Sequence, residues 1–143
     1  MREQKQTDRI LIADDHEIVR RGVRAILESR ADVKICGEAA NGQEAVEKAA
    51  RLQPDLIILD HSMPVLNGLA ATSQIRQLLP EVPILILSMH DSQPLIDAVR
   101  LVGATGFVPK AECADRLLEG VDAVLRGETF FKFQSRAHIG LAH

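Results

Sequence analysis

The stretch RILIADD, residues 9–15, decides the fold, because an apolar run ends abruptly in two acidic residues. Three more runs end in the same way, each in a polar residue: LIILD at 56–60, ILILS at 84–88 and GFVPK at 106–110. Short continuous apolar runs are typical of strands buried on both faces of a parallel sheet. The sequence therefore predicts parallel strands whose polar ends gather at one edge of the sheet.

Strand-like runs alternate along the chain with longer segments of helical periodicity. The runs lie near 9–14, 33–39, 55–60, 83–88 and 106–109. This alternation predicts a (βα)5 domain, an α/β three-layer sandwich in which helices cover both faces of a parallel sheet. Because Pro109 cannot donate a hydrogen bond to a neighbouring strand, we expect the last strand at an edge.

The intervening segments show one apolar face each, which predicts helices over 16–30, 42–53 and 112–126. The residues expected to face inward are Ile18, Val19, Val23, Ile26 and Leu27; then Ala45, Val46, Ala49, Ala50 and Leu52; and finally Leu117, Leu118, Val121, Val124 and Leu125.

The segment 93–102 predicts a helix that is more apolar than a surface helix requires. Leu95, Ala98, Val99 and Val102 lie on one side of this predicted helix, and Ile96 and Leu101 flank the opposite, polar side. Either the buried face of this helix is broad, or the helix offers a surface to a partner.

Length and composition limit the classes of protein to consider. The 143 residues fit one domain, and the net charge of −3 argues against a nucleic-acid binder held by phosphate contacts. The polar start MREQKQTD lacks a signal sequence, and no apolar run approaches the ~20 residues that cross a bilayer. The two cysteines lack metal-binding spacing, which predicts free thiols and a cytoplasmic location.

Three acidic residues are expected to meet at the edge of the sheet. With the strand order 2-1-3-4-5, ligands bind between the first and third strands, where Asp14, Asp15 and Asp60 lie. Crowded carboxylates repel one another unless a cation lies among them. Their hard oxygen atoms suit Mg²⁺, with Mn²⁺ as an alternative. We therefore predict a divalent metal site.

The polar residues around this site predict phosphoryl transfer. A carboxylate such as Asp60 can accept a phosphoryl group as an acyl phosphate. Lys110 would supply a positive charge for a phosphate oxygen, and Ser88 would supply a hydroxyl group. Phosphoryl transfer needs mainly positioning and neutralisation of charge, which these residues offer.

The motifs together resemble the receiver domain of two-component response regulators, closest in wording to the NarL/FixJ (LuxR-type) class. They are the Asp pair at 14–15, LDHSMPVLNG at 59–68, LSMHD at 87–91 and GATGFVPK at 103–110. The resemblance covers residues 8–127 and implies a flavodoxin-like fold with the sheet order 2-1-3-4-5. Each motif is weak alone, and their order and spacing are specific.

The resemblance implies a role for each site residue. Asp60 would be the phosphoacceptor for a sensor histidine kinase. Asp15, Asp60 and the backbone carbonyl of Ser62 would ligate Mg²⁺ directly, and Asp14 would act through a metal-bound water. Lys110 would pair with the phosphoryl group. Ser88 would move toward it, and Phe107 would be the aromatic switch that turns inward. The output face, and a homodimer interface, would lie near 93–126.

The chain departs from the family pattern at several positions. Ala111 follows Lys110 where the family usually has proline after a cis bond, so this peptide bond is expected to be trans or strained. Phe107 lacks the hydroxyl group of a tyrosine. His61 stands where an apolar residue is common. His90 occupies a position that affects hydrolysis of the acyl phosphate in the family, and its direction of effect is open.

The expected organisation is a polar extension at 1–8, a receiver domain at 9–127 and a tail or interdomain linker from 128–143. The function would be a signalling switch rather than an enzyme for free substrates. Transcription would be controlled through a DNA-binding domain absent from this chain, which would alone contact nucleic acid. Two alternatives remain: a stand-alone receiver that binds a protein, and a small Mg²⁺-dependent phosphohydrolase.

Overall fold

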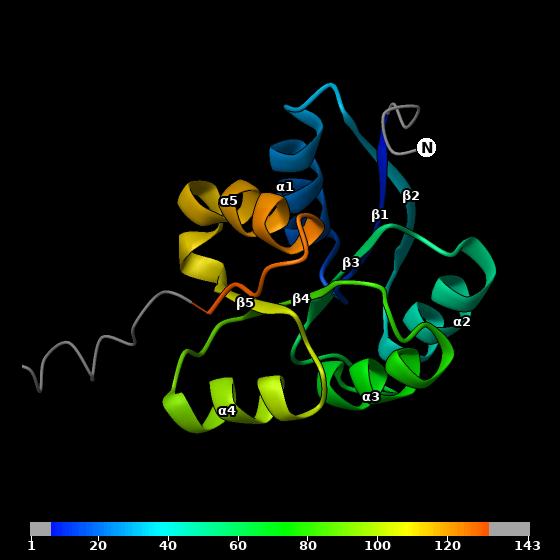
Figure 1. Cartoon of the computed structure of the whole chain (residues 1–143), viewed down its shortest axis with the longest axis vertical. Helices are drawn as coiled ribbons and strands as arrows, with labels where there is room; N and C mark the ends of the chain where they lie inside the picture. Colours follow the sequence, from blue (N-terminus) through cyan, green and yellow to red (C-terminus); the bar gives the residue numbers. More distant parts are fainter. Residues whose placement is uncertain (1–6, 132–143) are drawn as a thin grey trace, which may run out of the picture.

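The computed structural model describes residues 7–131. Its five strands are β1 (Asp8–Ala13), β2 (Val33–Ala39), β3 (Leu56–Asp60), β4 (Ile84–Ser88) and β5 (Gly106–Pro109). All neighbouring strands are parallel, and the order is β2-β1-β3-β4-β5 (Figure 1). This confirms the predicted order and the position of β5 at the edge.

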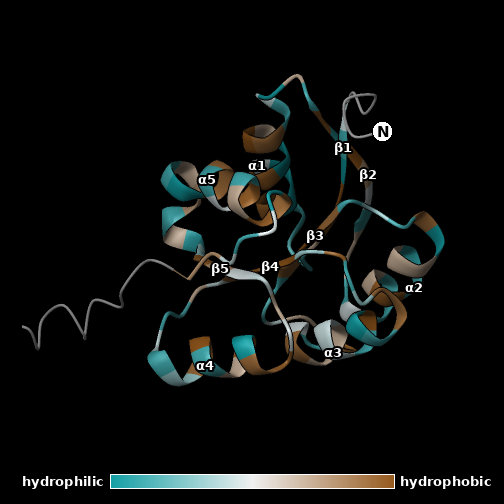
Figure 2. Ribbon diagram, in the orientation of Figure 1, coloured by the Kyte–Doolittle hydropathy of each residue, from teal (hydrophilic) through white to brown (hydrophobic). Residues whose placement is uncertain are grey.

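The helices cover both faces of the sheet. They are α1 (Glu17–Glu28), α2 (Gly42–Leu52), α3 (Gly68–Leu78), α4 (Gln93–Leu101) and α5 (Cys113–Leu125). Helices α1 and α5 lie on one face, and α2, α3 and α4 lie on the other (Figure 1). Figure 2 shows hydrophobic residues along the strands and on the sides of the helices that face them. The three-layer sandwich follows, because each sheet face buries its side chains under helices.

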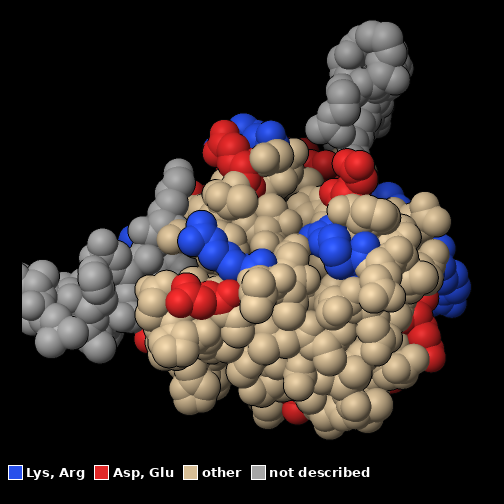
Figure 3. Space-filling view, turned by 60° about the horizontal axis from the view of Figure 1, so that its bottom comes forward, with Lys and Arg blue, Asp and Glu red and all other residues tan. Residues whose placement is uncertain are grey.

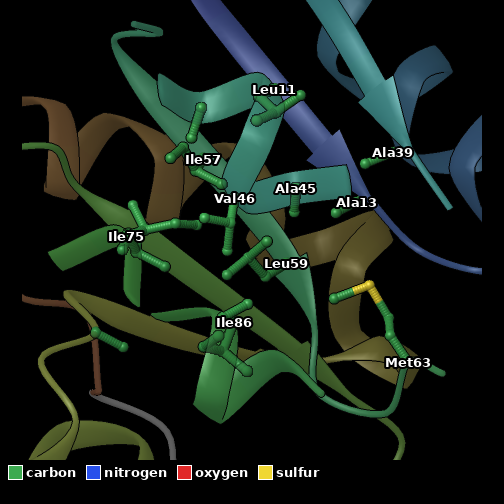
Figure 4. Close-up of a cluster of buried hydrophobic side chains, with 14 of the residues drawn as sticks. Leu11, Ala13, Ala39, Ala45, Val46, Ile57, Leu59, Met63, Ile75 and Ile86 are labelled. Carbon is green, nitrogen blue, oxygen red and sulfur yellow. The ribbon is translucent and has the colours of Figure 1, made fainter. Parts of the chain in front are cut away.

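Each face of the sheet has its own apolar core, and alternate residues of every strand point to opposite cores. Leu11, Ile57, Leu59 and Ile86 pack under α2, α3 and α4 (Figure 4). The residues between them along the strands pack under α1 and α5, against Leu27, Leu117 and Val121 among others. All the residues of β3 and β4 are buried, which explains why the sequence shows continuous apolar runs there.

Three of the helices begin at a polar side chain that binds the first turn. Asn41 accepts from the Glu44 N–H at 2.8 Å, and Asn67 accepts from the Ala70 N–H at 2.9 Å. Ser92 does the same for α4, whose Pro94 lies in the first turn. These caps satisfy N–H groups that have no partner within the helix, so they fix where the loops after β2, β3 and β4 end.

Several predicted inward residues face outward. Ile18 is 82% exposed, because it lies in the first turn of α1 at the end of the sheet, and Ala50 of α2 is also exposed. In α4 the buried residues are Ile96 and Val99, so the prediction placed Ile96 on the wrong side. That helix has apolar residues all round, and only its rotation against the sheet selects the stripe that is buried.

Other expectations about local structure have clear outcomes. The peptide bond between Lys110 and Ala111 is trans, since the described residues contain no cis bond. Cys36 and Cys113 are both free, and burial raises the pKa of the Cys113 thiol to about 11, which makes it unreactive at neutral pH. Among residues 7–131, no helix is long and apolar enough to cross a membrane.

The described chain beyond α5 continues past Gly127 along the edge of the sheet. Phe130 is completely buried and forms a parallel bridge with Gly106 on the outer side of β5. The predicted domain boundary at 127 stays a prediction, but residues up to 131 pack against the sheet. The remainder of the predicted tail, 132–143, and most of the N-terminal extension lie outside the described residues.

Candidate functional site

Three acidic side chains meet beyond the carboxyl ends of two adjacent strands. Asp14 and Asp15 follow β1, and Asp60 ends β3, and the pairing of Ala13 with Leu59 puts these ends side by side. Side-chain ligand atoms of Asp14, Asp15, Asp60 and His16 all lie within 4.8 Å of one another. The parallel register thus builds an acidic cluster from segments that are far apart in the sequence.

Lys110 reaches this cluster from the end of β5. Its Nζ lies 2.8 Å from Asp14 Oδ2 and 3.0 Å from Asp60 Oδ1. Burial lowers the pKa of Lys110, but hydrogen bonds to Asp14 and Asp60 outweigh that effect, so the pKa lies above its ordinary value. The ammonium group is therefore charged at neutral pH and holds two carboxylates together across the end of β4.

Asp60 is almost fully buried, with 3% of its surface exposed. Burial raises the pKa of Asp60, the charge of Asp14 raises it further, and Lys110 and the backbone of Ser62 lower it again. The net result is a pKa above the ordinary value. Such a carboxylate is desolvated and neighbours a fixed cation, which is typical of a reactive acid rather than a surface charge.

Ser88 and Phe107 lie on the strands between the acids and the sheet edge. Ser88 ends β4 and is buried, and its Oγ accepts from the His90 N–H at 3.0 Å. Phe107 is completely buried in β5, on the face that α4 covers. His90 is exposed in the loop that follows Ser88, and Ser62 is exposed two residues after Asp60.

His16 is a site residue that the sequence reasoning missed. Its Nδ1 lies 3.2 Å from Asp15 Oδ1 and 3.4 Å from Asp14 Oδ1, although the ring is largely exposed. Its backbone N–H donates to Asp14 Oδ1 at 2.8 Å. The signal was its position directly after the acidic pair, at the N-cap of α1. Asp14 therefore holds the turn that leads into α1, although no side chain caps the first turn of that helix.

The loop after Asp60 is held by a close approach of backbone to backbone. A Cβ on Gly68 would come within 2.4 Å of the Asp60 carbonyl oxygen, so only glycine fits there. The Gly68 N–H donates to the His61 carbonyl at 2.9 Å. The first turn of α3 therefore fixes the backbone that carries Asp60.

Residues 10–122 match the response regulator receiver domain, a family of signalling modules. The chain belongs to this family. The match begins within β1, covers the other four strands and most of α5, and includes every predicted site residue. The predicted family and fold are thereby confirmed, and residues 10–122 form a response regulator receiver domain.

The receiver domain is similar to curated bacterial regulatory proteins. The oxygen regulatory protein NreC of Staphylococcus haemolyticus is 42% identical over 123 residues, which cover 85% of this chain and 57% of that protein. The transcriptional regulatory protein DegU of Brevibacillus brevis is 36% identical over 121 residues, or 85% of this chain and 51% of that protein. The chain thus spans about half the length of these relatives.

Solved receiver structures agree with the architecture. A two-component response regulator of the LuxR family from Aurantimonas sp. superposes with a TM-score of 0.84 at 34% identity, over 87% of this chain and 89% of that chain. The receiver domain of NarL from Mycobacterium tuberculosis gives a TM-score of 0.80 at 28% identity, over 86% and 99% of the two chains. These neighbours support the resemblance to the NarL/FixJ class.

Proposed function

We propose that this receiver domain accepts a phosphoryl group on Asp60 from a sensor histidine kinase. The observation that carries the proposal is the bridge from Lys110 to Asp14 and Asp60 beside a desolvated acidic cluster. An Asp60 carboxylate oxygen attacks phosphorus, and the bond from phosphorus to the kinase's histidine nitrogen breaks. The phosphoryl group then remains on Asp60 as an acyl phosphate, and Lys110 pairs with one of its oxygens.

The donor set fits Mg²⁺. Carboxylate oxygens are the ligands that Mg²⁺ prefers, and three carboxylates lie within reach of one ion. Asp15, Asp60 and the backbone carbonyl of Ser62 would hold it directly, with Asp14 acting through water. When bound, the ion would neutralise the acids and the incoming phosphoryl oxygens. Mn²⁺ has the same ligand preference and would serve as a substitute.

Phosphorylation would act on a two-state equilibrium in this chain. The acyl phosphate gains bonds to Ser88 and Lys110 in one state only, so that state is favoured. Ser88 would move toward the phosphoryl group, and Phe107 would take the inward position that it occupies in this structure. If phosphorylation stabilises one state by about 5.5 kcal/mol more than the other, the equilibrium shifts from almost entirely the second state to almost entirely the first.

The surroundings of the site suit a protein partner. Three large apolar side chains are exposed on the segments that follow β1, β3 and β4: Ile18, Val65 and Met89. Contact with the kinase through these residues would remove water from the acidic site. Figure 3 looks onto the side of the molecule that carries α3 and α4, whose lower part in this view is largely uncharged, with basic and acidic side chains across the middle. An output contact or homodimer near 93–126 would use that side.

The output is proposed to be transcription. The relatives NreC and DegU are regulators about twice as long as the matched region, so a DNA-binding domain would lie outside this chain. We propose a cytoplasmic location for this chain, where a kinase and DNA would both be accessible. A stand-alone receiver would instead bind another protein through the same face. His90, exposed after Ser88, would modulate the loss of the phosphoryl group by hydrolysis.

Mass spectrometry after incubation with acetyl phosphate and Mg²⁺ tests the phosphoacceptor. We expect one added phosphoryl group on the wild type and none on Asp60→Ala. Glu47→Ala, which changes an exposed acid in α2, is the matched control and should react like the wild type. Labelling of Asp60→Ala at the wild-type level would show that another residue accepts the group.

A turnover assay separates the receiver from a phosphohydrolase. A receiver would consume about one equivalent of acetyl phosphate quickly and then only as fast as Asp60 loses its phosphoryl group. Sustained rapid hydrolysis of several small phosphate esters would instead favour the enzyme. His90→Ala should change the slow phase and leave the first equivalent unchanged.

A further inference from the structure

The segment after α5 is attached to the backbone of the proposed switch residue. The Phe107 N–H donates to the Phe130 carbonyl at 3.0 Å, and the Phe130 N–H donates to the Thr105 carbonyl at 3.0 Å. Phe130 thus forms an isolated parallel bridge with Gly106 on the outer side of β5, and Figure 1 shows this segment beside β5. A shift of the Phe107 backbone would therefore strain or break these hydrogen bonds and displace the chain that follows α5.

Two glycines leave the space that the Phe130 side chain occupies. A Cβ on Gly106 of β5 would lie 3.0 Å from Phe130 Cβ, and a Cβ on Gly120 of α5 would lie 3.0 Å from the ring. Phe130 belongs to the core under α5 and is completely buried. The buried Phe130 ring removes a large apolar area from water, and this burial holds the segment against β5 and α5.

Phe131 points to the opposite face, toward α4. The parallel register that pairs Gly106 with Phe130 brings Phe131 next to Phe107, and Phe131 packs against the same core as Phe107. The guanidinium carbon of Arg100, on α4, lies 4.4 Å from the centre of the Phe131 ring. A cation at this distance from a ring face attracts it. Arg100 and Phe131 thus join α4 to the edge of the sheet.

We propose that Arg100 and Phe131 form a latch that holds the Phe107 ring inward. β5 is the edge strand, so a ring that turns outward at Phe107 must pass the place where Phe131 packs. The closed latch therefore favours the same state as a phosphoryl group on Asp60, and this proposal rests on the function proposed above. Since such coupling is reciprocal, phosphorylation must also tighten the docking of residues 129–131.

This latch would carry the signal out of the domain. Residues 129–131 connect α5 to the chain that follows, and their docking depends on Phe107 on one side and on α4 on the other. The phosphorylation state of Asp60 would then set how firmly that connection is held. A partner or a further domain attached after residue 131 would respond without contacting the acidic site.

Binding of beryllofluoride with Mg²⁺, a stable mimic of the phosphoryl group, tests the coupling in the full chain. We expect Phe131→Ala and Arg100→Ala to weaken this binding by roughly two- to tenfold, since each opens the latch. Arg100→Lys keeps a cation over the ring and should restore part of the affinity. Leu101→Ala, an exposed neighbour on the same helix, is the control and should bind like the wild type.

Amide hydrogen exchange gives a readout that a merely structural role would not move. Beryllofluoride should slow exchange of the Phe130 and Phe107 amides in the wild type, and this slowing should be smaller in Phe131→Ala. Thermal unfolding of each variant checks that it is folded. Equal beryllofluoride affinity in all variants, or no change at the Phe130 amide of the wild type, would overturn the latch while the role of Asp60 stands. If the wild type binds no beryllofluoride, both proposals fail.

Discussion

Helices α5 and α4 flank the same edge strand, but they are attached to it very differently. α5 buries Cys113, Leu117, Gly120, Val121, Ala123 and Val124, whereas α4 buries only Ile96 and Val99. Asp122 of α5 is also tied to Arg30 by two hydrogen bonds of 2.7 Å. α4 contacts the segment 129–131 through the Arg100 guanidinium group, which lies over the Phe131 ring.

This difference indicates which element can move when the site changes its charge. A helix with little buried apolar surface opens or shifts at a lower free energy than one that is part of the core. α5 is thus a fixed support for Lys110 and the acidic cluster, and α4 is the helix that would respond to Phe107 under the proposed function. The predictions below test that contrast, from the largest effect to the smallest.

Truncation of a core residue in α5 should have the largest effect. Leu117 is completely buried, and Leu117→Ala should lower the free energy of unfolding by about 2–5 kcal/mol, because it leaves a cavity. Leu101 of α4 is 88% exposed, and Leu101→Ala should change it by less than about 0.5 kcal/mol. Urea denaturation measures both, and similar costs would contradict the contrast.

Gly68→Ala should disturb the site through α3. The new Cβ would collide with the Asp60 carbonyl oxygen, so we expect a loss of about 1–3 kcal/mol in unfolding free energy. Phosphorylation by acetyl phosphate should also slow, since the Asp60 backbone must shift. Gly22→Ala in α1 meets no atom within 4 Å and is the control. It should stabilise the protein by about 0.4–1 kcal/mol. A Gly68→Ala protein of wild-type stability would argue against this packing.

The ion pair between Arg30 and Asp122 of α5 should make a small, pH-dependent contribution to the free energy of unfolding. The hydrogen bond from Arg30 lowers the pKa of Asp122 below its ordinary value of 3.8, so the folded state binds that proton less tightly than the unfolded state. Its stabilisation is present above pH 3.8 and is lost as the pH falls through the lowered value. Because the pair is partly exposed, Asp122→Asn should cost about 0.5–1 kcal/mol at pH 7. Unfolding measured from pH 7 to pH 3 should show the two proteins converging.

Much of the fold and site followed from the sequence because the signals were local. Strand ends at Asp14, Asp60, Ser88 and Lys110 could be placed because each closes an apolar run. The buried stripe of α4 could not, since Ile96 and Leu95 are equally apolar and only packing against β5 chooses between them. His16 was missed because an exposed histidine carries no pattern until its neighbours are known.

The sequence by itself determined the alternation of strands and helices, the family and the polar residues at the strand ends, because periodicity and motif spacing are properties of the chain. The strand order was predicted through the resemblance to that family. Only the tertiary structure decided that Lys110 bridges two acids, that Phe130 occupies the space left by two glycines and that Arg100 covers Phe131. Such contacts depend on distances across the folded molecule. The sequence lists these side chains, but the packing of the sheet and helices sets the distances between them.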